Sequence, residues 1–289
     1  MNLAEWEKAL SLKLQKIYEP GEAASISDWV MEHITGAKRP ARLAKVDTGL
    51  SEEKINELEQ IEKRLLAQEP VQYVLNESWF FGHRFYVDPS VLIPRPETEE
   101  LVEWVLNSIK GNGTDPVILD IGTGSGCIPV SLKKKLPGAM VLAVDASPTA
   151  LQVARKNSLA LDAPVDLLHL DFLDKTNWGL LPVVDLLVSN PPYIPFSEAT
   201  SLSPNVTKYE PSLALFVPDE DALVFYRALA LFGKIKLKKG GQLFVETHEG
   251  LAGQVRDLFR SFGYETELRK DLQGKPRMIR AFISDGNLI

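Results

Sequence analysis

The stretch VILDIGTGSGC, residues 117–127, has the pattern of a strand, a glycine turn and the start of a helix. An apolar run of five residues is typical of a buried strand, and the three alternating glycines permit the positive φ angles of a tight turn. A helix that begins near Cys127 would present unpaired backbone N–H groups to a polar ligand. We expect a nucleotide-type ligand across this turn; a tight turn that binds nothing is the alternative.

Short apolar runs continue to alternate with helical segments on the C-terminal side of this turn. Such alternation builds a parallel sheet with helices on both faces, so we expect an α/β fold whose ligands bind at the carboxyl ends of the strands. The runs expected as strands are 117–121, 141–144, 167–170, 183–188 and 242–245, with a late pair at 264–268 and 278–283.

Residues 1–75 carry only helical patterns, which predict a small bundle whose outer surface is open to a partner. The breaks between its stripes are Pro20-Gly21 and Gly36, and Ser51 is the expected N-cap of the third helix. The apolar stripes are Trp6, Leu10, Leu14 and Ile17; Ile26, Trp29 and Val30; and Ile55, Leu58, Ile61 and Leu65.

Residues 76–95 are rich in aromatic and β-branched side chains and predict a β-hairpin connector, with Asp88-Pro89-Ser90 between its two runs. A helix is expected to start at Pro96, because proline suits the first turn and the glutamates that follow favour the positive end of the helix dipole. The expected third part, residues 96–289, holds the parallel sheet.

The bulk composition excludes several classes of protein. A net charge of −7 argues against a protein that gains its main affinity from neutralising phosphates. The single cysteine, Cys127, excludes a disulfide framework, and the four histidines lack metal-ligand spacing, so no metal is expected. No apolar run reaches the roughly 18 residues of a membrane span. We expect a cytoplasmic protein that does not contact a membrane.

Acidic residues follow the second and third expected strands. Asp145 ends its strand 19 residues after Gly126, where a carboxylate can accept both hydroxyls of a ribose. The next helix already has Ser147-Pro148 as cap and first turn, so a capping role for Asp145 is disfavoured. Asp171 and Phe172 could flank an adenine ring, or they could simply be a strand end and a core aromatic.

The fourth strand is expected to end at Asn190-Pro191-Pro192-Tyr193. A planar –NH₂ group is a poor nucleophile because its lone pair is delocalised. Asn190 Oδ1 and the rigidly held Pro191 carbonyl could accept hydrogen bonds from both N–H groups and direct the lone pair at an electrophile. Tyr193 could stack on the flat group. The alternative is a loop turn without chemistry.

The glycine spacing separates the candidate ligands. A dinucleotide loop would need glycine at position 127, which disfavours a dehydrogenase, and no P-loop motif is present. The G-x-G-x-G spacing resembles the S-adenosylmethionine loop of class I methyltransferases. The Asn-Pro-Pro-Tyr segment resembles that of amino-methyltransferases acting on adenine N6, guanine N2 or glutamine N5.

Nearly the whole chain, except for residues 284–289, resembles the HemK/PrmC family of protein-(glutamine-N5) methyltransferases. The resemblance implies a class I methyltransferase fold, with a Rossmann-like, mostly parallel seven-stranded sheet and a helical N-terminal domain joined by the hairpin. It implies an enzyme that uses S-adenosylmethionine, releases S-adenosylhomocysteine, and methylates the GGQ glutamine of peptide chain release factors. The segments that carry it are, in order, LIPRPETEELVE, LDIGTGSGCIPVSL, AVDASPTAL, SNPPYIP, YEPSLALF and KDLQGKPRMIRAF.

The resemblance also implies site residues. Asn190 to Tyr193 would hold the glutamine amide, and Asn190 would also border the cofactor. Arg95, Glu97 and Thr98 match a family segment near the active site, without an assigned role. The residues implied to bind the cofactor are Gly122, Thr123, Gly124, Ser125, Gly126, Asp145, Asp171 and Phe172.

Two other functions stay open at this point. The chain could methylate an exocyclic amine of DNA or RNA, or it could be a binding protein that kept the fold and lost the chemistry. The leading hypothesis is a monomeric enzyme whose partner is a release factor and which makes no direct contact with nucleic acid, because a DNA enzyme would need a basic groove.

Overall fold

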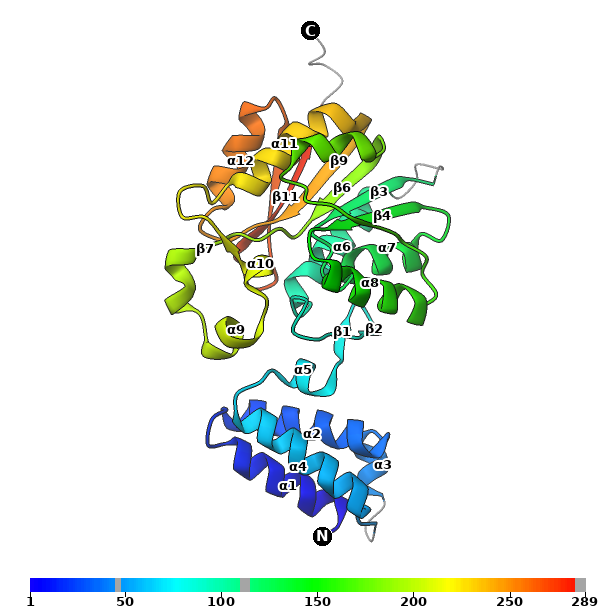
Figure 1. The fold of residues 1–289 in the computed structure, drawn as a ribbon, viewed down its shortest axis with the longest axis vertical. Helices are drawn as coiled ribbons and strands as arrows, with labels where there is room; N and C mark the ends of the chain where they lie inside the picture. Colours follow the sequence, from blue (N-terminus) through cyan, green and yellow to red (C-terminus); the bar gives the residue numbers. More distant parts are fainter. Residues whose placement is uncertain (45–47, 110–114, 284–289) are drawn as a thin grey trace. The chain divides into compact units, whose positions relative to one another are not determined.

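The computed structural model describes residues 1–44, 48–109 and 115–283, and these form two compact units (Figure 1). The first unit comprises Met1–Glu77 together with Pro204–Tyr209, and the second comprises Ser78–Ser203 and Glu210–Ile289. Each unit has its own hydrophobic core. Among the described residues, no helix combines the length and the apolar character that crossing a membrane would require.

The first unit consists of helices, as the sequence predicts. Asn2 closes a capping box at the start of the first helix, Pro20 occupies the first turn of the second, and the Ser51 side chain caps the fourth. The helices are α1 (Leu3–Leu14), α2 (Pro20–Thr35), α3 (Arg39–Leu43), α4 (Glu52–Leu66), α5 (Val71–Leu75) and α9 (Pro204–Tyr209).

The three long helices pack through the predicted apolar stripes. Leu14, Val30 and Leu65 are fully buried in this core. The prediction for Ile17 is wrong, since this residue lies beyond α1 and is 36% exposed. The residue before a proline is disfavoured in a helix, so the chain leaves α1 before Pro20 starts the next helix.

Helix α9 belongs to the first unit although it follows Ser203 in the sequence. The Tyr209 hydroxyl donates a 2.7 Å hydrogen bond to the carbonyl of Ala67, the residue that caps the C-terminus of α4. This bond satisfies one of the carbonyl groups that every helix leaves unpaired at its C-terminal end.

The second unit is built on a seven-stranded sheet in the order β10-β11-β9-β6-β3-β4-β5. All neighbouring strands are parallel except for β11, which pairs antiparallel with both β9 and β10. The mostly parallel seven-stranded fold is therefore confirmed. The strands are β3 (Val117–Ile121), β4 (Met140–Asp145), β5 (Asp166–His169), β6 (Val184–Ser189), β9 (Leu237–Glu246), β10 (Glu265–Lys270) and β11 (Pro276–Phe282).

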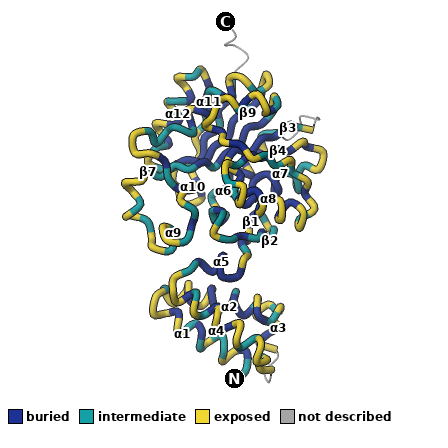
Figure 2. Tube along the Cα trace, in the orientation of Figure 1, coloured by how far each residue is buried: buried dark blue, intermediate teal, exposed yellow. Residues whose placement is uncertain are grey.

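Helices cover both faces of this sheet. One core lies between the sheet and helices α6 (Pro96–Ser108) and α7 (Cys127–Lys135); α8 (Pro148–Ala160) packs beside α7. The other core lies under α11 (Val224–Lys236) and α12 (Ala252–Ser261). Since both faces are buried, the central strands are continuous apolar runs, as the dark central strands of Figure 2 show.

The smaller elements of the second unit connect this framework. They are the hairpin β1 (Ser78–Phe80) and β2 (His83–Phe85), the 3₁₀ helices η1 (Lys175–Leu180) and η2 (Phe196–Ser201), the paired short strands β7 (Ile194–Pro195) and β8 (Phe216–Val217), and helix α10 (Ser212–Leu215).

The hairpin exists, but its turn is not where the sequence analysis expects it. The strands are joined by Phe81 and Gly82, with φ angles of 49° and 77°. Two-residue hairpin turns need such positive angles, which glycine adopts without strain. Asp88-Pro89-Ser90 instead forms a separate turn, in which the Ser90 N–H donates to Asp88 Oδ1 at 2.9 Å.

Asn157 fixes the segment after the hairpin to the parallel sheet. It lies on α8 and is 1% exposed. Its Oδ1 accepts from the Tyr86 N–H at 2.7 Å, and its Nδ2 donates to the carbonyls of Tyr86 and Ser125 at 2.9 and 2.8 Å. One amide therefore satisfies three backbone groups, one of them in the glycine turn.

We predict that Asn157→Ala destabilises the second unit. Each buried backbone group left without a partner costs about 1–3 kcal/mol, so we expect the free energy of unfolding to fall by at least about 2 kcal/mol. Chemical denaturation of the full chain measures this change. The control is Gln152→Ala, which truncates an amide on the exposed face of the same helix and should change stability by less than about 0.5 kcal/mol. Equal effects of the two variants would contradict the prediction.

Candidate active site

The strand register brings the ends of five neighbouring strands to one edge of the sheet. Ile121 of β3 lies opposite Val144 of β4 and Ser189 of β6. Ser189 in turn lies opposite Val245 of β9, and β5 pairs with β4 on the other side. The same level of the sheet therefore holds the residues that end or directly follow these strands: Gly122, Asp145, His169, Asn190 and Glu246.

A cavity of about 270 Å³ opens at this edge, within the second unit. Of the residues predicted to bind a ligand, seven line it: Gly122, Gly124, Asp145, Asp171, Phe172, Asn190 and Pro192. The other side of the cavity is formed by residues 90–92 and by the start of α10. The structure thus brings the glycine turn and the Asn-Pro-Pro-Tyr segment to one pocket.

The glycines of the turn have two different tasks. Gly122, Gly124 and Gly126 have φ angles of 75°, 53° and 79°. A Cβ added to Gly122 or Gly124 would meet nothing within 4 Å, so these two leave their backbone open to a ligand. A Cβ at Gly126 would lie 3.1 Å from the Ala154 Cβ, so the third glycine permits close packing against α8.

Asp145 is held in place by backbone hydrogen bonds. Its Oδ2 accepts from the Gly124 N–H at 2.8 Å and its Oδ1 accepts from the Ser147 N–H at 2.9 Å. Burial raises the pKa of Asp145, and these two hydrogen bonds act in the opposite direction. Each carboxylate oxygen has a further lone pair, so the group can still accept from the hydroxyls of a bound ligand.

Asp120 and Thr123 place unsatisfied polar atoms under the glycine turn. Both Asp120 carboxylate oxygens and Thr123 Oγ1 are buried without a hydrogen-bond partner among the described residues. Burial raises the pKa of Asp120 to about 7. A buried, unpaired carboxylate is costly, which is consistent with a site that is completed by a positively charged or hydrogen-bonding ligand.

Asn190 belongs to a chain of hydrogen bonds. Its Nδ2 donates to Thr98 Oγ1 at 3.1 Å, and Thr98 Oγ1 donates to Glu246 Oε2 at 2.6 Å. The Tyr193 hydroxyl donates to Glu246 Oε1 at 3.3 Å. The amide nitrogen of Asn190 is therefore engaged, and its Oδ1 remains as an acceptor in a residue that lines the cavity.

The other predicted residues lie around the pocket. The side chains of Thr123 and Ser125 are buried, and Gly126 is the N-cap of α7. Phe172 packs on Trp178, with ring centroids 5.6 Å apart, so it is a core aromatic, and it also lines the cavity. Pro191 and Tyr193 lie within the described chain but outside the lining of this cavity.

Arg95 and Glu210 join two segments that the sequence analysis treated separately. Glu210 is 5% exposed; its Oε1 accepts from Arg95 at 2.5 Å and its Oε2 accepts from the Ile93 N–H at 3.2 Å. This buried carboxylate fixes the chain before α6 to the chain before α10, both of which border the cavity.

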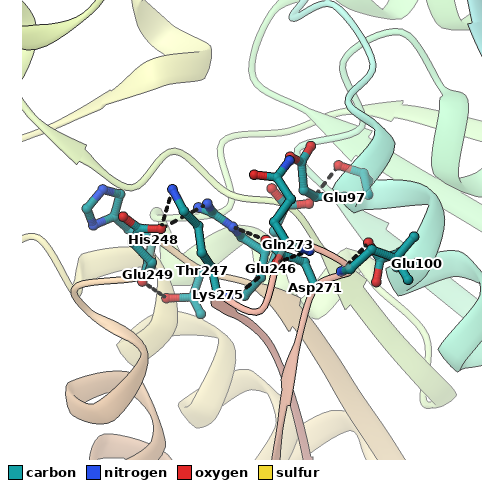
Figure 3. A network of polar contacts seen from close by, with 12 residues as sticks. Glu97, Glu100, Glu246, Thr247, His248, Glu249, Asp271, Gln273 and Lys275 are labelled. Atoms are coloured by element: carbon teal, nitrogen blue, oxygen red, sulfur yellow. Dashed lines mark hydrogen bonds and ion pairs between the residues drawn. The ribbon is translucent and has the colours of Figure 1, made fainter.

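Glu246 is the main site residue that the sequence analysis missed. It is 2% exposed and directly follows the apolar run of β9. The signal was present, because an acid at the end of a strand is the same pattern that identified Asp145. Near Glu246 in the chain, Glu249 pairs with Lys275, whose backbone N–H donates to Asp271 (Figure 3). The backbone N–H of Gln273 also donates to Asp271, and its side chain donates to Glu97 on α6.

The described residues contain no group of three or more His, Cys, Asp or Glu side chains arranged to hold a metal ion. Cys127 is buried at the start of α7, and burial raises its thiol pKa to about 12. The chemistry of the cavity therefore depends on the groups described above.

Two family models match this chain. The methyltransferase small domain matches residues 99–208, which include the glycine turn and Asn190. The PrmC N-terminal domain matches residues 5–75, which form most of the helical first unit. Both matches agree with the division of the chain into a helical and an α/β part.

Curated relatives extend over nearly the whole chain. A release factor glutamine methyltransferase from Flavobacterium psychrophilum is 38% identical, covering 92% of this chain and 94% of its own length. A release factor glutamine methyltransferase from Bacteroides thetaiotaomicron is 41% identical, covering 93% of this chain and 95% of its own length. Among solved structures, a methyltransferase from Pyrococcus furiosus aligns with a TM-score of 0.52 at 18% identity, covering 76% of this chain and 96% of that one, which shows the shared fold.

We predict that Arg95→Met destabilises the second unit by about 1–3 kcal/mol, since it leaves the buried Glu210 carboxylate without its cationic partner, although the Arg95 side chain itself is 34% exposed. The double variant Arg95→Met, Glu210→Gln should recover part of this loss. Denaturation of the four proteins in a double-mutant cycle measures the coupling energy. Purely additive effects would mean that the pair does not act as a unit.

Proposed function

We propose that this chain, which belongs to the release factor glutamine methyltransferase family, transfers a methyl group from S-adenosylmethionine to the GGQ glutamine of peptide chain release factors. The observation that carries the proposal is the cavity shared by Asn190, with its free amide oxygen, and the glycine turn. The methylated atom is the side-chain amide nitrogen of that glutamine.

The residues of the cavity fit S-adenosylmethionine. This cofactor supplies a methyl carbon made electrophilic by an adjacent sulfonium. The Asp145 carboxylate suits the two ribose hydroxyls, and Gly122 and Gly124 offer backbone that no side chain covers. Phe172 offers an apolar face to the adenine ring. The Asp171 carboxylate can accept a hydrogen bond from the amino group of the adenine. Asp120 does not line the cavity, but its buried carboxylate lies two residues before Gly122, and its negative charge favours the cationic part of the molecule.

Asn190 and Pro191 act on the acceptor amide. An amide nitrogen is planar and its lone pair is delocalised. Asn190 Oδ1 and the Pro191 carbonyl accept hydrogen bonds from its two N–H groups, which moves the nitrogen toward tetrahedral geometry and orients its lone pair. Neither acceptor changes its protonation state, so no general base is needed, and the surplus proton leaves after the C–N bond forms. Alignment of this kind can supply up to roughly 7–11 kcal/mol of the barrier.

The helical first unit provides recognition of the release factor in this proposal. Its support is the match of residues 5–75 to the PrmC N-terminal domain. The enzyme acts on protein and needs no direct contact with nucleic acid, in keeping with a net charge of −7.

Transfer of a labelled methyl group tests this function. The purified chain is incubated with methyl-labelled S-adenosylmethionine and a release factor, a release factor whose GGQ glutamine is replaced by alanine, or DNA and RNA. We expect label only in the unmodified release factor. Label in nucleic acid alone, or equal labelling of the alanine-containing factor, would refute the proposal.

We predict that Asn190→Ala lowers kcat by at least about 100-fold, comparable to the loss of one preorganised transition-state hydrogen bond in other enzymes. Affinity for S-adenosylmethionine should change by less than about threefold, because the lost group acts on the acceptor amide. Steady-state kinetics and calorimetric titration with the cofactor separate the two effects.

Asp145→Ala is the matched comparison at the same edge of the sheet. Loss of a charged acceptor is worth about 1.5–3 kcal/mol, so we expect the cofactor affinity to weaken about 10- to 100-fold. If both variants lost affinity equally, Asn190 would mainly serve the cofactor, and its role in orienting the amide would be wrong.

A further inference from the structure

We infer that Thr98 and Glu246 are positioning residues that determine which end of the Asn190 amide faces the acceptor substrate. The inference rests on the proposed function, since it matters only where Asn190 must accept hydrogen bonds from an amide nitrogen. The sequence assigns no role to Thr98 and does not single out Glu246.

The three residues come from three separate elements of the second unit. Thr98 lies in the first turn of α6, where its backbone N–H donates to the Arg95 carbonyl at 3.1 Å. Asn190 follows β6 and Glu246 ends β9, and these strands are in register at Ser189 and Val245. Thr98 and Glu246 are each 2% exposed, so water cannot replace either partner.

The direction of each hydrogen bond follows from the carboxylate. An ionised glutamate can only accept, so the Thr98 O–H must donate to Glu246 Oε2, at 2.6 Å. The threonine hydroxyl has a single proton, so it can only accept at its other contact, which is 3.1 Å from Asn190 Nδ2. The –NH₂ end of Asn190 is thereby held toward Thr98, and the carbonyl end is left for the substrate.

The second oxygen of Glu246 is also occupied. The Tyr193 hydroxyl donates to Oε1 at 3.3 Å. Tyr193 and Asn190 belong to the same tetrapeptide, so one buried carboxylate fixes both of its ends. Each carboxylate oxygen of Glu246 therefore accepts one hydrogen bond, from Thr98 or from Tyr193.

Protonation of Glu246 would remove this constraint. A carboxylic acid can donate to Thr98, and the threonine could then donate to Asn190 Oδ1, which reverses the amide and presents –NH₂ to the acceptor. The pKa of Glu246 is raised to about 7, chiefly by burial, and the negative charge of Glu97 on α6 acts in the same direction. The hydrogen bonds from Thr98 and Tyr193, and the positive charge of Arg277 on β11, act in the opposite direction.

Substitutions at Thr98 test the hydroxyl directly. We expect Thr98→Val to lower kcat on the release factor by at least about tenfold, because valine has the same shape but can hydrogen-bond to neither Glu246 nor Asn190. KM and the affinity for the cofactor should change by less than about threefold. Thr98→Ser keeps the hydroxyl and should recover at least about half of the wild-type kcat. The matched control is Thr247→Val at the equally buried residue directly after Glu246, because the Thr247 hydroxyl donates to the His248 carbonyl. The kcat of this variant should stay within about twofold of wild type.

The pH profile of kcat tests Glu246. At saturating substrates, kcat reports groups of the loaded enzyme. Burial also raises the pKa of Asp120 to about 7, and Asp120 is present in both the wild type and Glu246→Gln, so the comparison of these two proteins separates the two acids. We expect the wild-type kcat to fall about tenfold from pH 8 to pH 6, as a single group with a pKa near 7 gains its proton. Glu246→Gln cannot titrate, and its kcat should be lower than wild type at pH 8 but vary less than about twofold over this range.

The outcomes separate this inference from the proposed function. If the wild-type chain methylates the release factor while Thr98→Val keeps its kcat, or Glu246→Gln keeps the wild-type pH profile, the positioning role is wrong and the function stands. If the wild-type chain transfers no methyl group to the factor, the function itself is wrong. Thermal unfolding of each variant identifies a kcat loss that comes only from misfolding: Thr98→Val and Thr98→Ser should unfold within a few degrees of each other while differing in kcat.

Discussion

The register of β6 between β3 and β9 is the constraint on which the rest of the site depends. A strand that slipped by one residue would turn every side chain to the opposite face of the sheet. Ser189 lies opposite both Ile121 and Val245. The next residues along these three strands, Asn190, Gly122 and Glu246, therefore lie at the same level of the sheet. Burial on both faces holds this register, since Leu187 belongs to one core and Val188 to the other. The hydrophobic cores thus determine the position of polar groups that they do not contain.

The same edge of the sheet collects buried acids. Asp145 and Glu246 end β4 and β9, and Asp120 is the penultimate residue of β3. Burial raises the pKa of each of these three acids. These three acids differ in the groups that stabilise their negative charge. Asp145 accepts backbone N–H groups and Glu246 accepts hydroxyls, whereas Asp120 has no partner in the described chain. Carboxylates in such an environment are characteristic of functional sites rather than of stabilising ion pairs.

Local patterns in the sequence predicted most of the fold and one side of the site. Apolar runs identified all seven strands of the large sheet. The glycine spacing and the acid that ends β4 pointed to the edge of the sheet where the cavity lies. The turn of the hairpin was misplaced because Asp88-Pro89-Ser90 is a stronger turn signal in the sequence than Phe81-Gly82. A two-residue hairpin turn instead needs residues with positive φ angles, which Phe81 and Gly82 have. Helices α3 and α5 are too short to show a periodic stripe.

The partners of buried polar residues could not be predicted in the same way. Glu210 and Arg95 are 115 positions apart, and Thr98 and Glu246 are 148 apart. No local pattern connects such positions, and each pairing arises only from the order of strands in the folded sheet. The roles of Arg95 and Thr98 therefore became clear only with their partners.

The place of α9 in the first unit has a consequence for how the protein is made. The long helices α1, α2 and α4 leave the ribosome early and contain their own core. Pro204–Tyr209, however, is translated only after the whole stretch from Ser78 to Ser203. A six-residue helix does not form in isolation, so α9 folds only on helices that have already formed. The N-terminal unit is therefore completed late in synthesis, when the glycine turn and Asn190 have already been translated.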